Sequence, residues 1–309
     1  MEEFVSIIVK SGTSAVNLSL YTLLPVMVVL MAFMRVLEAK KILYIISKAL
    51  SPVLKLFGIH GLGAFAMLQT LFIGFAAPIS TLAIMEGKSY SRKELAAVFA
   101  MILAMSQANA VFPLLTVGLE FDFTLVSSLI GGIVAASTTY YIFTRSMESA
   151  DGHAEAEVDD ESDKKLLPLL VEGGQRGMQI VAQSVPMLML ALFAVNVFNS
   201  IGLIGLAEKA LSPLTDLMQI PSIAVLPFLT KYLAGGTAMM GVSLDLVGTG
   251  KMTSLELNRI AGWMINPLDL VGIGLYMSAG PKTASIAKIA IPGALIGIAV
   301  RGFLHFVFF

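Results

Sequence analysis

The sequence predicts an all-α integral membrane protein built from two repeats of inverted topology, and three observations carry this prediction. First, 57% of the 309 residues are hydrophobic and only 13% are charged, whereas about a quarter of the residues in a soluble domain carry a charge. Second, the pentapeptide Lys-Ala-Leu-Ser-Pro begins at residue 48 and again at residue 209, an offset of 161. Third, a long apolar run in each half is interrupted by glycine.

The apolar runs 61–86 and 221–247 are expected to organise the two halves. Residues 74–78 of the first run read Gly-Phe-Ala-Ala-Pro, and residues 235–237 of the second read Gly-Gly-Thr. Such breaks persist inside a membrane only where protein buries them or water reaches them. We therefore interpret each run as a re-entrant hairpin, in which two half-helices meet at a tip of small residues. The two tips are expected to face each other near the middle of the membrane.

The offset divides the chain into two units of similar length. It carries Gly74 onto Gly235, and one residue further out of step it carries the capping box that begins at Ser91 onto another that begins at Thr253. Each box is a Ser/Thr-x-x-Glu pattern that opens an apolar helix. The sequence therefore predicts repeat 1 over residues 1–146, an acidic cytoplasmic linker over 147–165 and repeat 2 over 166–309.

Each unit is expected to contain a spanning helix, an interfacial amphipathic helix, the hairpin, a broken transmembrane helix and a last spanning helix. The first unit opens with an amphipathic segment 2–14 and a spanning helix to residue 34, followed by the stretch 35–55 and the hairpin. A helix 94–119, interrupted at Asn109 and Pro113, and a helix 123–144 complete it. In the second unit the elements are helix 178–198, the stretch that ends at Pro213, the hairpin, a helix 256–278 interrupted at Asn266, Pro267 and Asp269, and a helix 284–303.

The distribution of positive charge predicts the topology. If each hairpin turns back, each unit crosses the membrane three times, and the odd number inverts the second unit. Most of the 20 lysines and arginines then share one side. The basic residues on or near the other side are Lys10, Lys209, Lys251, Arg259 and Arg301. By the positive-inside rule, the crowded side faces the cytoplasm and both termini lie outside the bacterial inner membrane.

Three short motifs resemble the nucleoside-recognition (Gate) family. They are Leu37-Glu38, the segment Phe-Gly-Ile-His-Gly at 57–61 and the segment Gly-Phe-Ala-Ala-Pro at 74–78, and residues 76–86 look most like the spore-maturation branch of the family. The family also takes in the membrane domain of ferrous-iron transporters and the concentrative nucleoside transporters. The resemblance implies inverted repeats, with substrate held between the hairpin tips and the helix breaks.

The chain departs from its iron- and nucleoside-transporting relatives at the first tip. Phe75 stands where the iron transporters have a cysteine, and the chain has no cysteine at all, which argues against iron. The Gln-Thr-Glu motif of the nucleoside transporters has a counterpart only in Gln69-Thr70, which is displaced by about a helical turn, and no glutamate adjoins Pro78. The resemblance therefore leaves the solute open.

Three ionisable residues in apolar surroundings are candidate functional groups. Lys231 lies one turn before Gly235, and a charge at mid-membrane costs about 2.5–3.5 kcal/mol on insertion scales. We expect it to face a cavity or a partner, either Asp269 or an anionic group of the substrate; the alternatives are snorkelling or a structural pair. Asp269 and Asp245 are the candidate ion-coupling residues, although Asp245 could instead lie near the hairpin mouth.

Polar and small residues that flank the tips and breaks complete the candidate substrate site. They are Gln69, Thr70, Gln107, Asn109, Gly235, Gly236, Thr237 and Asn266. Their amides and hydroxyls would bind a solute or Na⁺, or would instead satisfy the backbone groups that the breaks release. The glycines open a half-helix, and the free amides of a helix N-terminus suit an anionic group.

These features predict a secondary transporter of a small polar solute, including an anionic or nucleoside-like one, coupled to H⁺ or Na⁺. The alternative is a non-transport envelope scaffold of the spore-maturation type. The sequence contains no arrangement of nucleophile and base and no metal-ligand spacing, so an enzyme is not expected. We expect no cofactor other than the coupling ion, no nucleic-acid partner, contact with the lipid bilayer, and assembly into a homo-oligomer.

Overall fold

The computed structural model describes residues 2–87, 90–147, 164–217 and 219–309, and every regular element in these ranges is a helix. Five helices are long and apolar enough to cross a membrane, or six if one bent pair forms a single span. The protein is therefore a multi-pass membrane protein. The predicted acidic linker falls largely on residues 148–163, which lie outside the described residues.

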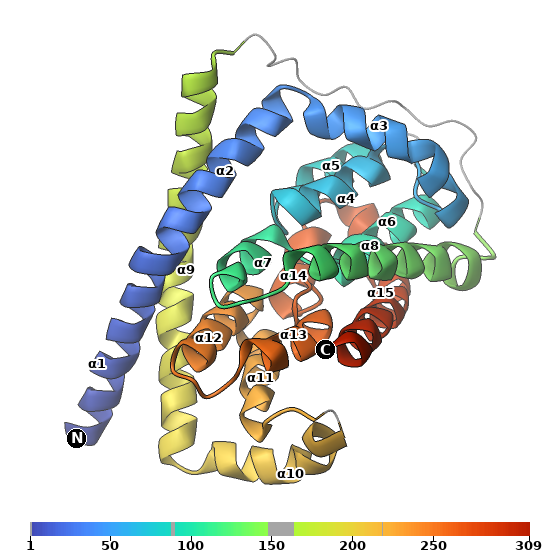
Figure 1. Cartoon of the computed structure of the whole chain (residues 1–309). Helices are drawn as coiled ribbons and strands as arrows, with labels where there is room; N and C mark the ends of the chain where they lie inside the picture. The colour runs from blue at the N-terminus through green and yellow to red at the C-terminus, as the bar shows by residue number, and fades with distance from the viewer. Residues whose placement is uncertain (1, 88–89, 148–163, 218) are drawn as a thin grey trace.

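A pair of long helices forms one side of the molecule (Figure 1). The first consists of α1 (Glu2–Asn17), a π-helical segment η1 (Leu18–Leu23) and α2 (Leu24–Ala39). The predicted amphipathic segment 2–14 falls within α1, and it continues into the spanning helix without a break. Pro25 lies at the start of α2, and the wider π-helical turns before it accommodate a residue that cannot donate a backbone hydrogen bond. The second long helix, α9 (Leu166–Ser200), runs antiparallel to the first.

Small residues allow the two long helices to approach closely. A Cβ atom at Gly173 would collide with the carbonyl oxygen of Met31, and one at Gly177 would lie 2.6 Å from the carbonyl oxygen of Met27. Two small residues four apart are the usual means by which membrane helices bring their backbones together. The contact between α2 and α9 thus depends on backbone packing.

Two amphipathic helices lie at opposite ends of the molecule (Figure 1). They are α3 (Ile42–Leu54) and α10 (Leu203–Leu217), and each contains one copy of the repeated pentapeptide. On α3, Leu43 is buried whereas Ile45 is 63% exposed. A helix with one apolar face on the protein and another exposed suits the membrane interface.

Two helical hairpins follow these amphipathic helices. The first consists of α4 (Leu62–Phe72) and α5 (Pro78–Gly87), and the second of α11 (Val225–Ala234) and α12 (Gly236–Gly248). Gly74 and Gly235 at the two tips have φ angles of 134° and 87°. These values are readily adopted only by glycine, so the tips require the glycines that interrupt the apolar runs.

The first broken helix consists of α6 (Arg92–Ala104) and α7 (Ala108–Leu115). The predicted capping box at Ser91 is present and opens α6. The break falls at residues 105–107, whereas the sequence placed it at Asn109 and Pro113, both of which lie inside α7. Distant side chains that bind the backbone at this break, described below, explain its position.

The second broken helix consists of α13 (Ser254–Met264) and α14 (Leu270–Met277). Its capping box at Thr253 is also present, and the helix is interrupted around Asn266, as the sequence predicted. The element order of the first half thus recurs in the second.

The core of the protein surrounds α6, which is buried from Glu94 to Ala104. α8 (Phe121–Thr138), continued by η3 (Thr139–Phe143), and α15 (Pro281–Phe308) pack against it, and α13 packs against α15. Glu86 at the end of the first hairpin accepts hydrogen bonds from the backbone amide of Thr283 (2.9 Å) and from its hydroxyl (2.7 Å) at the start of α15. The hairpin is thereby attached to the core.

Candidate functional site

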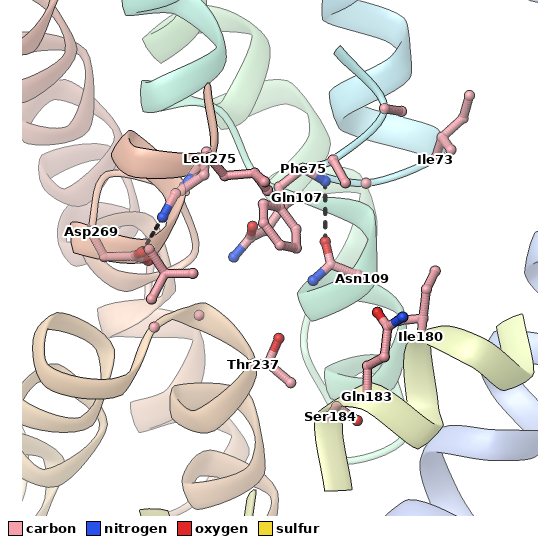
Figure 2. A pocket seen from close by; sticks show the side chains of 18 of the residues that line it. Ile73, Phe75, Gln107, Asn109, Ile180, Gln183, Ser184, Thr237, Asp269 and Leu275 are labelled. Carbon is pink, nitrogen blue, oxygen red and sulfur yellow. Dashed lines mark hydrogen bonds between the residues drawn. The ribbon is translucent and has the colours of Figure 1, made fainter. Parts of the chain in front are cut away.

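A cavity of about 590 Å³ lies where the two hairpin tips, the two helix breaks and the middle of α9 meet (Figure 2). Its walls are residues 73–77 and 234–237 of the tips, Gln107 and Asn109 at the first break, Asp269 with its neighbours at the second, and one face of α9. Pockets of about 300–1,000 Å³ are typical of small-molecule sites. The cavity is therefore large enough to enclose a small solute.

Six of the residues predicted for the site line this cavity. They are Gln107, Asn109, Gly235, Gly236, Thr237 and Asp269. Their positions follow from the fold, because Gln107 is the N-cap of α7, Asp269 the N-cap of α14 and Gly235 the N-cap of α12. The beginnings of three half-helices therefore point at one space.

The hairpin tips contact the breaks directly. The backbone amide of Phe75 donates to Oδ1 of Asn109 at 3.3 Å (Figure 2). A Cβ atom at Gly236 would collide with Nε2 of Gln107, so the second tip also touches the first break. The tip residues and the break residues thus form one continuous surface.

A buried ion pair supports the second break. Nζ of Lys231 donates to the backbone oxygen of Asn266 (2.5 Å) and lies 3.3 Å from Oδ2 of Asp269. Oδ1 of Asp269 accepts from the amide of Gly272 at 2.8 Å and so caps α14. Of the two partners expected for Lys231, Asp269 or an anionic group of the substrate, Asp269 is the one that the structure places beside it. Lys231 itself lies behind the cavity wall and is completely buried.

Four other predicted residues do not line the cavity. The hydroxyl of Thr81 donates to Oε1 of Gln69 at 2.6 Å, which joins α5 to α4. The hydroxyl of Thr70 donates to the backbone of its own helix. Asn266 is buried, and its side chain binds backbone atoms of the break. Asp245 is half-buried on α12. Gln69, Thr70 and Asn266 thus satisfy backbone or side-chain groups of their own hairpin or break, which was the alternative interpretation of such side chains.

One polar face of α9 was missed by the sequence analysis. Arg176, Gln179, Gln183 and Ser184 line the cavity from α9. The first three are spaced by three and four residues, which places them on one face of a helix. Two amides inside an otherwise apolar span were a usable signal, because such groups normally find a polar partner within the membrane.

Four charged side chains join α2 and α9 at one end of this face. Nε of Arg35 lies 2.9 Å from Glu172, and Arg176 lies 3.5 Å from both Glu38 and Glu172. The two positive and two negative charges balance. The network therefore neutralises Arg176, which also lines the cavity.

The sequence analysis also misplaced Arg301. It was counted with the basic residues on or near the outer side, but the structure buries it completely in α15. Its Nη1 donates to the backbone oxygens of Ala104 (2.6 Å) and Ile265 (3.0 Å), and its Nη2 donates to Oγ of Ser106 (2.5 Å). Ala104 ends α6 and Ile265 is the C-cap of α13, so one guanidinium supplies donors to both helix breaks.

Comparison with solved structures identifies the fold of the chain. The chain is similar to CNTnw in an inward-facing substrate-bound state, with a TM-score of 0.67 and 14% identity over 93% of this chain and 73% of that one. It is equally similar to a variant of CNTnw in an outward-facing state, with a TM-score of 0.67 and 16% identity over 100% of this chain and 85% of that one. CNTnw is a concentrative nucleoside transporter, and at this identity the likeness establishes the fold alone.

Comparison of sequences shows the family. The family model described as "Gate: Nucleoside recognition" matches residues 20–121. Spore maturation protein B of Bacillus subtilis (strain 168) is 30% identical over 132 residues, which cover 41% of this chain and 73% of that protein. The chain therefore belongs to the nucleoside-recognition (Gate) family of membrane proteins, as a relative of spore maturation protein B, and has the fold of a concentrative nucleoside transporter.

Proposed function

We propose that the protein is a secondary transporter that moves a small polar solute across the bacterial inner membrane by alternating access to the cavity. The observation that carries the proposal is the meeting of two hairpin tips and two broken helices around one cavity of about 590 Å³, into which a few polar side chains project from a mostly apolar wall. Secondary transporters hold their substrates in this way, between discontinuous helices near the middle of the membrane. That CNTnw has been solved in inward- and outward-facing states supports the same kind of motion here.

Reciprocal contacts support the two inverted repeats that alternating access requires. Nδ2 of Asn196 donates to Oγ of Ser11 at 2.9 Å at one end of the α1–α2/α9 pair, and Arg35 binds Glu172 at the other end. The offset of 161 carries Ser11 onto Glu172 and Arg35 onto Asn196. Each contact is therefore the image of the other under exchange of the units, as expected for a two-fold axis in the membrane plane with the hairpins entering from opposite sides.

The proposed orientation places the acidic linker in the cytoplasm and both termini outside. Lys165 and Thr249 are exposed and would lie on opposite sides of the membrane. Because the chain has no cysteine, single cysteines report position without background. In intact cells, an impermeant maleimide is expected to label Thr249→Cys, and to label Lys165→Cys only after the membrane is opened. Labelling of both variants from the same side would contradict the inverted topology.

Transport is tested with the purified protein in proteoliposomes. We expect saturable movement of a polar solute that depends on an H⁺ or Na⁺ gradient, with Asp269 as the coupling residue, because an ionisable group inside the membrane usually marks an ion pathway. Asp269→Asn is expected to abolish the dependence on the gradient or to stop transport. Asp245→Asn is the matched control, since Asp245 lies outside the cavity wall. An equal effect of both substitutions would show that Asp269 has no special role in coupling.

The kinship with spore maturation protein B supports a second candidate function, that of an envelope scaffold without transport activity. The two candidates differ in what the cavity is for. If a broad panel of polar solutes is neither bound nor moved, while a variant with a filled cavity, Gly236→Leu, still supports normal envelope assembly in cells, the scaffold replaces the transporter.

A further inference from the structure

We propose that the cavity recognises an anionic group of its solute, a carboxylate or a phosphate monoester, at the beginning of α12. This inference rests on the proposed transporter function and narrows its substrate class. Two observations support it. Hydrogen-bond donors without acceptors lie together at one part of the cavity, and each charged residue of the cavity wall is already paired with an opposite charge.

Gln107 provides the first unpartnered group. Its side chain is only 2% exposed, yet it lines the cavity and has no hydrogen-bond partner among the described residues. An amide in such a position gains a hydrogen bond when a ligand or water enters the cavity. Its Nε2 points at Gly236, because a Cβ atom on that glycine would strike it. The structure therefore directs a strong donor to the start of α12 and gives it nothing to bind there.

The backbone at the start of α12 provides three more donors. The first intrahelical hydrogen bond runs from the amide of Met239 to the oxygen of Gly235 at 3.1 Å. The amides of Gly236, Thr237 and Ala238 precede it, and none has an acceptor within the part of the chain that the structure describes. The N-cap Gly235 has no side chain that could cap the helix. Gly236 and Thr237 line the cavity, so the first two of these donors lie at its wall.

The charges in the cavity wall leave these donors available to a ligand. Arg176 and Asp269 are the charged residues among those that line it. Arg176 is balanced by Glu38 and Glu172. Asp269 is engaged through one oxygen by Lys231 and through the other by Gly272. Oδ1 of Asp269 would lie 3.9 Å from a Cβ atom on Gly235, but Lys231 offsets the charge of this carboxylate. The positive end of the α12 dipole therefore still favours an anion.

The donor set indicates the chemical class of the group. Several N–H donors converge in the cavity, and no free cation projects into it from the described residues. Carboxylate and phosphate oxygens accept several hydrogen bonds at once, whereas a neutral hydroxyl or amide would leave most of these donors unsatisfied. The remainder of the solute then lies against the neutral side chains of Asn109 and Gln183 (Figure 2).

The inference is tested without knowledge of the natural solute by adding a carboxylate to the protein itself. In Gln107→Glu the new carboxylate can accept the α12 amides, so we expect the melting temperature to rise by about 2–4 °C. Gln107→Leu, which offers no acceptor, is the comparison. Gln183→Glu places the same charge in the interior of α9, away from any helix N-terminus, and is expected to give no rise. If Gln107→Glu is no more stable than Gln107→Leu, the proposal is overturned.

Small ligands that differ in charge test the anion site directly. Benzoate and inorganic phosphate are expected to raise the melting temperature of the wild-type protein in a saturable manner, benzamide is not, and Gln107→Glu should not respond to either anion. A response to benzamide that equals the response to benzoate would overturn the anion site. Binding of anions without transport in proteoliposomes would support the anion site and contradict the transporter function. Transport of neutral solutes alone would support the transporter function and contradict the anion site.

Discussion

Arg301→Met is expected to lower the free energy of unfolding by about 2–4 kcal/mol, because it removes the donor of two buried backbone oxygens, each of which costs about 1–3 kcal/mol when left unsatisfied. The methionine still fills the space of the arginine stem, which packs against Gly131. Removal of a buried cation offsets part of the loss. The loss nevertheless dominates, since the guanidinium lies at the C-terminal ends of α6 and α13, where the helix dipoles favour positive charge.

The measurement is thermal unfolding of the purified protein in detergent. Arg301→Lys keeps the charge but has a single point of attachment, so we expect it to fall between the wild type and Arg301→Met. Phe303→Met on the same helix is the control, because Phe303 is 62% exposed and touches no break. A melting temperature of Arg301→Met that equals that of Phe303→Met would show that the breaks do not depend on Arg301.

Features of the fold with a local cause could be predicted from the sequence. The capping boxes at Ser91 and Thr253 need only four consecutive residues, and the tips at Gly74 and Gly235 need only a residue that tolerates positive φ; the structure contains all four. The position of the first break could not be predicted in this way. The amide of Ser106 donates to Oγ of Ser128 at 2.7 Å, and Arg301 binds the same turn, so residues far along the chain fix where the helix unwinds.

The residues of the candidate site also differ in whether local sequence reveals their role. Gln107 and Asp269 could be found because each is polar in an apolar run and each stands at the N-cap position of a half-helix that the break creates. Gln69 was misleading, since its polar partner is Thr81 of the same hairpin and no sequence pattern reveals such a pair. The role of Arg301 was hidden because a basic residue near the end of a spanning helix normally reaches the interface.

Separate replacement of Lys231 and Asp269 is expected to destabilise the protein strongly. Lys231→Met leaves the Asp269 carboxylate buried without its cation, and Asp269→Asn leaves a completely buried ammonium with only the backbone oxygen of Asn266. Breaking a buried ion pair from either side typically costs about 3–5 kcal/mol, most of it the penalty of the charge that remains.

The double variant Lys231→Met with Asp269→Asn is expected to recover most of that stability. It contains no unpaired charge, and replacing a buried ion pair by neutral groups of similar size is often neutral or better. The asparagine oxygen can still accept from Gly272 and cap α14. Thermal unfolding of the four proteins gives the coupling energy between the two residues as a double-mutant cycle. Additive losses would show that the pair, although 3.3 Å apart, is not coupled.

Activity should separate from stability in the double variant. If the pair only holds α11 to the second break, restored stability brings restored transport. If Asp269 couples the ion, as we propose, the stable double variant remains inactive or loses its dependence on the gradient, because the ionisable group of the cavity wall is gone. The proteoliposome assay on a folded double variant therefore distinguishes a structural ion pair from a coupling site, and gradient-driven transport at the wild-type rate would assign the pair to structure alone.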